Sequence, residues 1–147
     1  DFLCTSSSYG DFIMKLKFKL EGNEGFINAG VQFRSRRATD PSYEMIGYQA
    51  DIGNGYYGAL YDETRRNRVL AGPDSITATE IINPGDWNTY EIRAEKDHIQ
   101  LFLNGQKTVD YRETDAGISR NGIIGLQVHG GGRALVSYKD MTIEELN

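Results

Sequence analysis

Apolar and polar residues alternate with a period of two through much of this chain, and this pattern constrains the fold more than any other feature. From Met14 to Leu20, apolar residues alternate strictly with lysine. Successive side chains of a strand point to opposite faces, so the run at 12–20 predicts a long strand with one face in water. Comparable runs predict further strands at 28–34, 48–52, 58–61, 87–94, 98–104, 106–111, 122–129 and 134–146.

Turn signals separate these runs and set the fold class. Residues 83–86 (NPGD) and the dipeptide Asn104-Gly105 are strong turn sequences, and residues 21–25 and 95–97 are also turn-like. The stretch 64–71 fits a short helix or a loop equally well. About nine or ten strands without βαβ spacing favour an all-β sandwich of two antiparallel sheets.

Composition limits the function classes. The 147 residues predict one domain over 1–147, with a net charge of −5 and no basic block, so we expect no nucleic acid partner. No apolar run reaches about 18 residues, so we expect no membrane insertion. Cys4 alone cannot form an internal disulfide, and with only His98 and His129 beside it the chain lacks the ligands of zinc fingers and iron–sulfur clusters.

Three stretches resemble known functional motifs, but the sequence around each of them does not fit the motif. Residues 53–58 (GNGYYG) match a dinucleotide fingerprint, but no βαβ unit surrounds them. Residues 129–132 (HGGG) resemble an esterase oxyanion loop, but the chain has no G-x-S-x-G elbow. Residues 95–100 (EKDHIQ) approach the paired-carboxylate string of glucanases, yet they lie over a predicted turn and end in Gln.

One polar face remains after sorting side chains by alternation. Strand 28–34 places Gln32 and Arg34 opposite its apolar residues, and the strands near 49, 61 and 127 do the same for further polar groups. Planar hydrogen-bonding groups and aromatic rings suit sugar hydroxyls and the C–H face of a pyranose, whereas a solvated sheet face is the simpler alternative. The candidate residues are Gln32, Arg34, Gln49, Asp51, Tyr61, Glu63, Gln127 and His129.

Eight short motifs, in order along the chain, give it a family resemblance. They are DFIMKLKF at 11–18, NAGVQFR at 28–34, GYQADI at 47–52, GALYDE at 58–63, GDWN at 85–88, LNG at 103–105, GIIGLQVH at 122–129 and YKDMTI at 138–143. Together they resemble the 3-keto-disaccharide hydrolase domain family. Ala29 departs from the usual Ser, and the resemblance implies a further strand and turn before residue 1.

The resemblance implies a concanavalin A-like jelly-roll sandwich and chemistry on oxidised sugars. In a 3-keto-glycoside the ketone acidifies the C2 hydrogen, so a base can remove it, the C1 group leaves and water adds later. Such a reaction needs one base and a group that stabilises the enolate, such as a divalent metal ion or an arginine. The resemblance also implies a periplasmic or extracellular location.

These implications assign roles as hypotheses. We expect His129 to be the base, Arg34 to stabilise the oxyanion and Asp51 to complete the catalytic set, with Asp51, Glu63 and His129 as metal candidates. Substrate-positioning candidates are Gln32, Gln49, Tyr61, Glu63 and Gln127. A non-catalytic carbohydrate-binding module on the same fold is the main alternative, and a structural or adhesion domain is another, because a fold does not fix a function.

Overall fold

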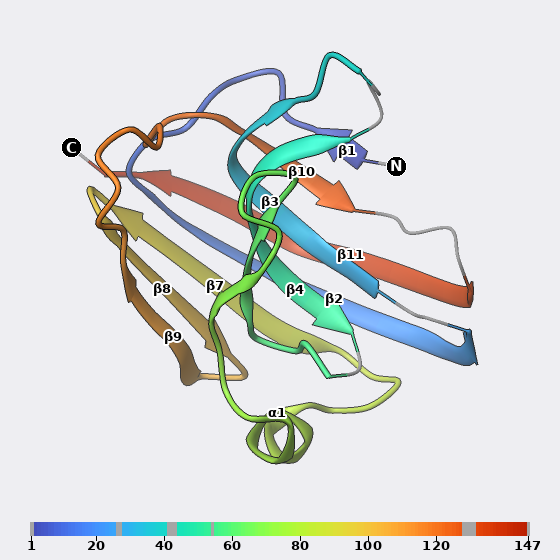
Figure 1. Cartoon of the computed structure of the whole chain (residues 1–147). Coiled ribbons are helices and arrows are strands. Elements are labelled where there is room, and N and C mark those ends of the chain that lie inside the picture. Colours follow the sequence, from blue (N-terminus) through green and yellow to red (C-terminus); the bar gives the residue numbers. More distant parts are fainter. Residues whose placement is uncertain (1, 26–27, 41–43, 54, 128–131, 147) are drawn as a thin grey trace.

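Two antiparallel sheets make up the fold in the computed structural model, which describes residues 2–25, 28–40, 44–53, 55–127 and 132–146 (Figure 1). The six-stranded sheet has the order β1-β10-β3-β4-β5-β6, and the five-stranded sheet has the order β11-β2-β7-β8-β9. Their bounds are β1 (Phe2–Cys4), β2 (Phe12–Gly25), β3 (Asn28–Arg37), β4 (Met45–Gly53), β5 (Leu60–Glu63), β6 (Val69–Ala71), β7 (Asn88–Glu95), β8 (His98–Leu103), β9 (Gln106–Arg112), β10 (Ile123–Gln127) and β11 (Gly132–Glu145). The predicted all-β sandwich is confirmed.

The core lies between the two sheets and follows the alternation in the sequence. Leu16 and Phe18 of β2 are 1% and 0% exposed, while Lys15 and Lys17, which alternate with them, face solvent. Burying large apolar side chains from both sheets is the main favourable contribution to such a fold. The strand pattern alone therefore predicted which side of β2 faces the core.

Tight turns form at positions where the sequence predicts them. Asn104 and Gly105 both adopt positive φ, 50° and 81°, as a two-residue hairpin turn between β8 and β9 requires. Lys96 adopts φ 53° in the turn between β7 and β8. These hairpins fix the register of three neighbouring strands.

The structure corrects one local prediction and decides another that the sequence left open. The turn expected at 21–25 is strand, because β2 continues there alongside β11, with Glu21 opposite Leu135 and Gly25 opposite Gly132. Residues 64–71, which fit a short helix or a loop equally well by sequence, form a turn followed by β6. A helix lies at α1 (Ser75–Ile81), where the sequence predicts none. Asp74 caps this helix by accepting a hydrogen bond from the Thr77 amide at 2.8 Å.

The described residues contain one helix, α1, which has seven residues. No helix in these ranges has the length and apolar character that crossing a bilayer requires.

Candidate functional site

Polar side chains gather on the outer face of the six-stranded sheet, across β10, β3, β4 and β5. The register forms rows of Cα partners that run across the strands. One row is Gln127–Gly30–Asp51, the next is Gly125–Gln32–Gln49–Tyr61, and a third is Gly47–Glu63. We call the six polar residues Gln32, Gln49, Asp51, Tyr61, Glu63 and Gln127 the polar face. Six of the eight residues selected from the sequence thus lie together.

The centre of the polar face is buried although it lies on the side of the sheet away from the core. Gln32, Gln49 and Asp51 are 0%, 1% and 3% exposed. The buried Oε1 atoms of Gln32, Gln49 and Gln127 accept no hydrogen bond from the described residues. A buried acceptor without a donor costs about 1–3 kcal/mol, so three of them on one face favour a ligand that brings donors, such as a set of hydroxyl groups.

Glycines between these residues let the polar side chains lie flat across the strands. A Cβ at Gly30 would lie 2.7 Å from Gln49 Nε2, and a Cβ at Gly47 would lie 2.3 Å from Ser35 Oγ. Gln32 Nε2 in turn donates to Ser35 Oγ at 3.1 Å. The small residues are therefore part of the site, because any side chain at Gly30 would displace the Gln49 amide.

Asp51 has the most perturbed acidity on this face. Burial raises its pKa to about 8, the charge of Glu63 adds to the rise, and the hydrogen bond from Gln49 Nε2 at 2.5 Å opposes it. Burial likewise raises the pKa of Glu63, with help from Glu44 and Asp62. Asp51 consequently carries a proton at neutral pH and can donate a hydrogen bond as well as accept one.

Tyr61 borders the two acidic residues. Burial raises the pKa of its phenol, and the charges of Glu63 and Asp51 raise it further. Its aromatic ring is half-buried, so it offers both an apolar face and a hydroxyl at the edge of the site.

Two tyrosines of the opposite sheet support the polar face from behind. Tyr90 of β7 donates from its hydroxyl to the Asp51 carbonyl oxygen at 3.0 Å, and Tyr138 of β11 donates to the Gln127 carbonyl oxygen at 3.0 Å. Both side chains cross the core, so alternation identifies them only as apolar positions. No signal in the sequence shows which backbone oxygens their hydroxyls reach.

Arg34 lies away from this face, contrary to the alternation expected on its strand. The register of β3 shifts between Phe33 and Arg36, and Arg34 adopts φ 46°, so the strand bulges there. The 3% exposed Arg34 donates to Gly10 O at 3.0 Å and Lys96 O at 2.7 Å, and it pairs with Asp11 at 3.1 Å. Its guanidinium therefore ties β3 to the other sheet and is not among the charges that act on Asp51.

His129 lies outside the described residues, so its predicted role as base or metal ligand stays a prediction. Within the described ranges no group of three or more His, Cys, Asp and Glu side chains is arranged to hold a metal ion. Of the two other metal candidates, Glu63 lies close enough for its charge to raise the pKa of Asp51.

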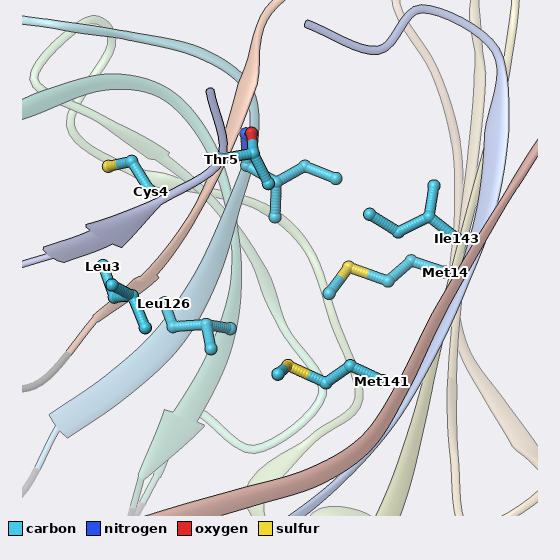
Figure 2. A pocket seen from close by; sticks show the side chains of 8 residues that line it. Leu3, Cys4, Thr5, Met14, Leu126, Met141 and Ile143 are labelled. Carbon is cyan, nitrogen blue, oxygen red and sulfur yellow. The ribbon is translucent and has the colours of Figure 1, made fainter. Parts of the chain in front are cut away.

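An apolar groove of about 350 Å³ opens between the sheet edges formed by β1 and β10 on one side and β2 and β11 on the other. In Figure 2, Leu3 and Leu126 face Met14, Met141 and Ile143 across this space. Its lining offers few hydrogen-bonding groups, so the polar face is the better site for a ligand rich in hydroxyls.

A family model described as the 3-keto-alpha-glucoside-1,2-lyase-like domain matches residues 1–144. The chain belongs to this family. The resemblance carried by its eight short motifs is thereby confirmed. A search of curated proteins found no match.

Several solved structures share the fold of this 3-keto-alpha-glucoside-1,2-lyase-like domain. The carbohydrate binding module CBM66 from Bacillus subtilis is 18% identical, with a TM-score of 0.74 over 98% of this chain and 81% of its own. A protein named "Putative glycosyl hydrolase" from Parabacteroides distasonis is 19% identical, with a TM-score of 0.71 over 99% and 83%. Sheep galectin-11, in complex with glycerol, is 11% identical, with a TM-score of 0.56 over 98% and 95%. At these identities the likeness shows the fold, and it confirms the jelly-roll sandwich.

Proposed function

We propose that this domain binds a carbohydrate on the polar face and cleaves a 3-keto-glycoside there by elimination. The observation that carries the proposal is the group of glutamines around Asp51: Gln32, Gln49 and Gln127 have buried amide oxygens that accept no hydrogen bond from the described residues. Sugar hydroxyls are donors in closely spaced sets, so they match this surplus of acceptors. Membership in a 3-keto-alpha-glucoside-1,2-lyase-like family supports the choice of sugar.

The reaction we propose keeps atoms and electrons balanced without a paired-carboxylate site. A base takes the proton from C2, and the C2–H electron pair forms an enolate with the C3 ketone. The enolate then re-forms the ketone, a C1=C2 double bond forms and the C1–O bond breaks. The aglycone leaves with the electron pair of the C1–O bond and takes up a proton. Water adds across the resulting C1=C2 bond, which gives net hydrolysis.

In this scheme Asp51 is the group that stabilises the enolate. Its buried carboxyl holds a proton at neutral pH and keeps one oxygen bound to Gln49 Nε2, so the other oxygen can donate to the C3 oxygen of the sugar. Arg34, the residue expected from the sequence for this role, is engaged by Asp11 and two backbone carbonyls. We therefore assign the stabilisation of the enolate to Asp51 instead of Arg34.

We retain His129 as the proposed base on the strength of the sequence. A divalent metal ion is a second way to stabilise an enolate. Among the described residues only Asp51 and Glu63 would contribute to it, and a protonated Asp51 is a poor ligand. No step of the scheme is therefore routed through a metal.

The experiment is release of 4-nitrophenol from 4-nitrophenyl 3-keto-glucoside, with 4-nitrophenyl glucoside measured in parallel. We expect release from the keto substrate alone, a loss of about 100-fold in Asp51→Ala, and a fall in rate as the pH rises through about 8. We also expect Gln49→Leu to weaken binding of the sugar by about tenfold, because its amide no longer meets the hydroxyls.

Gln106→Leu is the matched control, because Gln106 is exposed on β9 of the opposite sheet. It should leave both rate and binding unchanged. Sugar binding that depends on Gln49, without release from either substrate, would instead identify a carbohydrate-binding module, the second function that this fold supports. Release that is insensitive to both Asp51 and Gln49 would show that the polar face is not the site.

A further inference from the structure

A second, polar pocket of about 300 Å³ lies at one end of the sandwich and plays no part in the proposed function. It is formed by the ends of β3 and β4, the turn between β5 and β6, and the segment 117–121 before β10. Its polar lining consists of Arg34, Ser35, Arg36, Arg65, Ser119 and Asn121. We call it the arginine pocket, because Arg34 and Arg36 of β3 and Arg65 of the turn after β5 all line it.

The structure fixes two of these arginines in place. The guanidinium of Arg34 is held by backbone carbonyls at 2.7 Å and 3.0 Å. The guanidinium of Arg65 lies over the ring of Tyr48 at 4.8 Å and donates from Nε to Asp62 at 2.8 Å. Rigidly held guanidinium groups lose little conformational entropy when they bind a ligand.

Charge around the arginine pocket is not balanced. Carboxylates compensate three nearby arginines, in the pairs Arg34–Asp11, Arg65–Asp62 and Arg66–Glu113. Arg36 lines the pocket and makes no ion pair within the described residues. Burial lowers the pKa of Arg34, and the positive charge of nearby Arg120 acts in the same direction. Asp115 adds a negative charge beside the pocket, where it accepts a hydrogen bond from the Gly117 amide at 2.8 Å, and Arg36 and Arg120 together outweigh it. The pocket therefore keeps a small excess of positive charge although the whole chain has a net charge of −5.

We propose that the arginine pocket binds a tetrahedral oxyanion, a sulfate or phosphate group. Arg36 makes no ion pair within the described residues, so its guanidinium fork would donate paired hydrogen bonds to such an anion. Arg34 and Arg65, whose guanidinium groups are already hydrogen-bonded, add positive charge around it. The Ser119 hydroxyl already donates to the Asn121 carbonyl oxygen at 2.9 Å, so the side-chain amide of Asn121 is the further donor in the lining. The oxyanion can be a free ion or an ester on a small molecule, since both present the same group to the arginines.

The test is a titration of the ¹⁵N-labelled protein with sodium sulfate and with sodium phosphate, at ionic strength held constant with sodium chloride. We expect saturable shifts in the amide signals of 117–121 and in the side-chain Nε signals of Arg36 and Arg65. Arg36→Gln should weaken the affinity about five- to tenfold, and it should still fold, because Arg36 is exposed and makes no ion pair within the described residues.

Arg93→Gln is the control, since it removes the same charge from an exposed position on β7 of the other sheet. Equal weakening in both variants, or shifts spread over the surface without saturation, would overturn the proposal. Glucose 6-phosphate, inorganic phosphate and glucose then distinguish the two sources. Tighter binding of the ester than of inorganic phosphate indicates a phosphorylated small molecule, and equal binding indicates the free ion.

Discussion

Replacement of Asp51 by asparagine should stabilise this protein at neutral pH and remove much of its pH dependence. Burial raises the pKa of Asp51 from an ordinary value of 3.8 to about 8 in the folded state. Between these two values the folded chain binds the Asp51 proton and the unfolded chain does not. Stability from this group is therefore complete below pH 4 and is lost as the pH rises toward 8.

The magnitude follows from the pKa difference. Each pH unit between the two values lowers the free energy of unfolding by about 1.4 kcal/mol, so the loss from pH 4 to pH 7 is about 4 kcal/mol. Asparagine has the shape of a protonated aspartate, stays neutral at every pH and can still accept the hydrogen bond from Gln49. The Asp51→Asn variant should match the wild type near pH 4 and exceed its stability by about 4 kcal/mol at pH 7.

Urea unfolding of both proteins at several pH values from 4 to 8 measures this difference directly. Asp40→Asn serves as the control because Asp40 is exposed, and its change in stability should stay within about 0.5 kcal/mol. A wild-type-minus-variant difference that does not change with pH would refute the reasoning, since it would mean that Asp51 ionises equally easily in the folded and unfolded chains.

Three further perturbations test the supporting contacts by the same unfolding assay. Arg34→Lys should lower the free energy of unfolding by about 3 kcal/mol, because lysine cannot replace all three hydrogen bonds of the buried guanidinium; an effect below about 0.5 kcal/mol would contradict the bridging role. Tyr90→Phe should cost about 1–2 kcal/mol by removing the buried hydrogen bond from its hydroxyl to the Asp51 carbonyl, which keeps the Gly58 amide at 3.2 Å as a donor, and no loss would argue against that hydrogen bond. Burial acts to raise the pKa of Glu113, but hydrogen bonds from Arg66 and Tyr48 hold it at about 2; wild-type stability should therefore fall between pH 4.5 and 2, and this fall should be smaller in Glu113→Gln.

Alternation identified most of the polar face because side-chain direction in a strand is a local property. Gln32, Gln49 and Asp51 each follow an apolar neighbour, so their shared face could be predicted from the sequence alone. Their order across the sheet could not, because β10 pairs with β3 only after about 90 intervening residues bring the strands together. The strand pairing turned three separate predictions into one surface.

Local irregularities of the strands could not be predicted from the sequence for the same reason. The bulge at Arg34 breaks the alternation, and its cause is tertiary: the guanidinium reaches Asp11 and Lys96 in the opposite sheet. Strand β2 runs through a turn-like sequence because β11 lies beside it. In both places, long-range hydrogen bonds outweighed the local preference of the chain.

The sequence by itself determined the class of fold, the hairpin turns, the apolar faces of the strands and the family. These depend on residue type and spacing, which act over a few neighbouring positions. Only the tertiary structure decided that Arg34 bridges the sheets, that Asp51 is buried deeply enough to keep its proton, and that Tyr90 supports it from behind. Burial and long-range hydrogen bonding depend on which strands meet, and that information is not local to any segment of the chain.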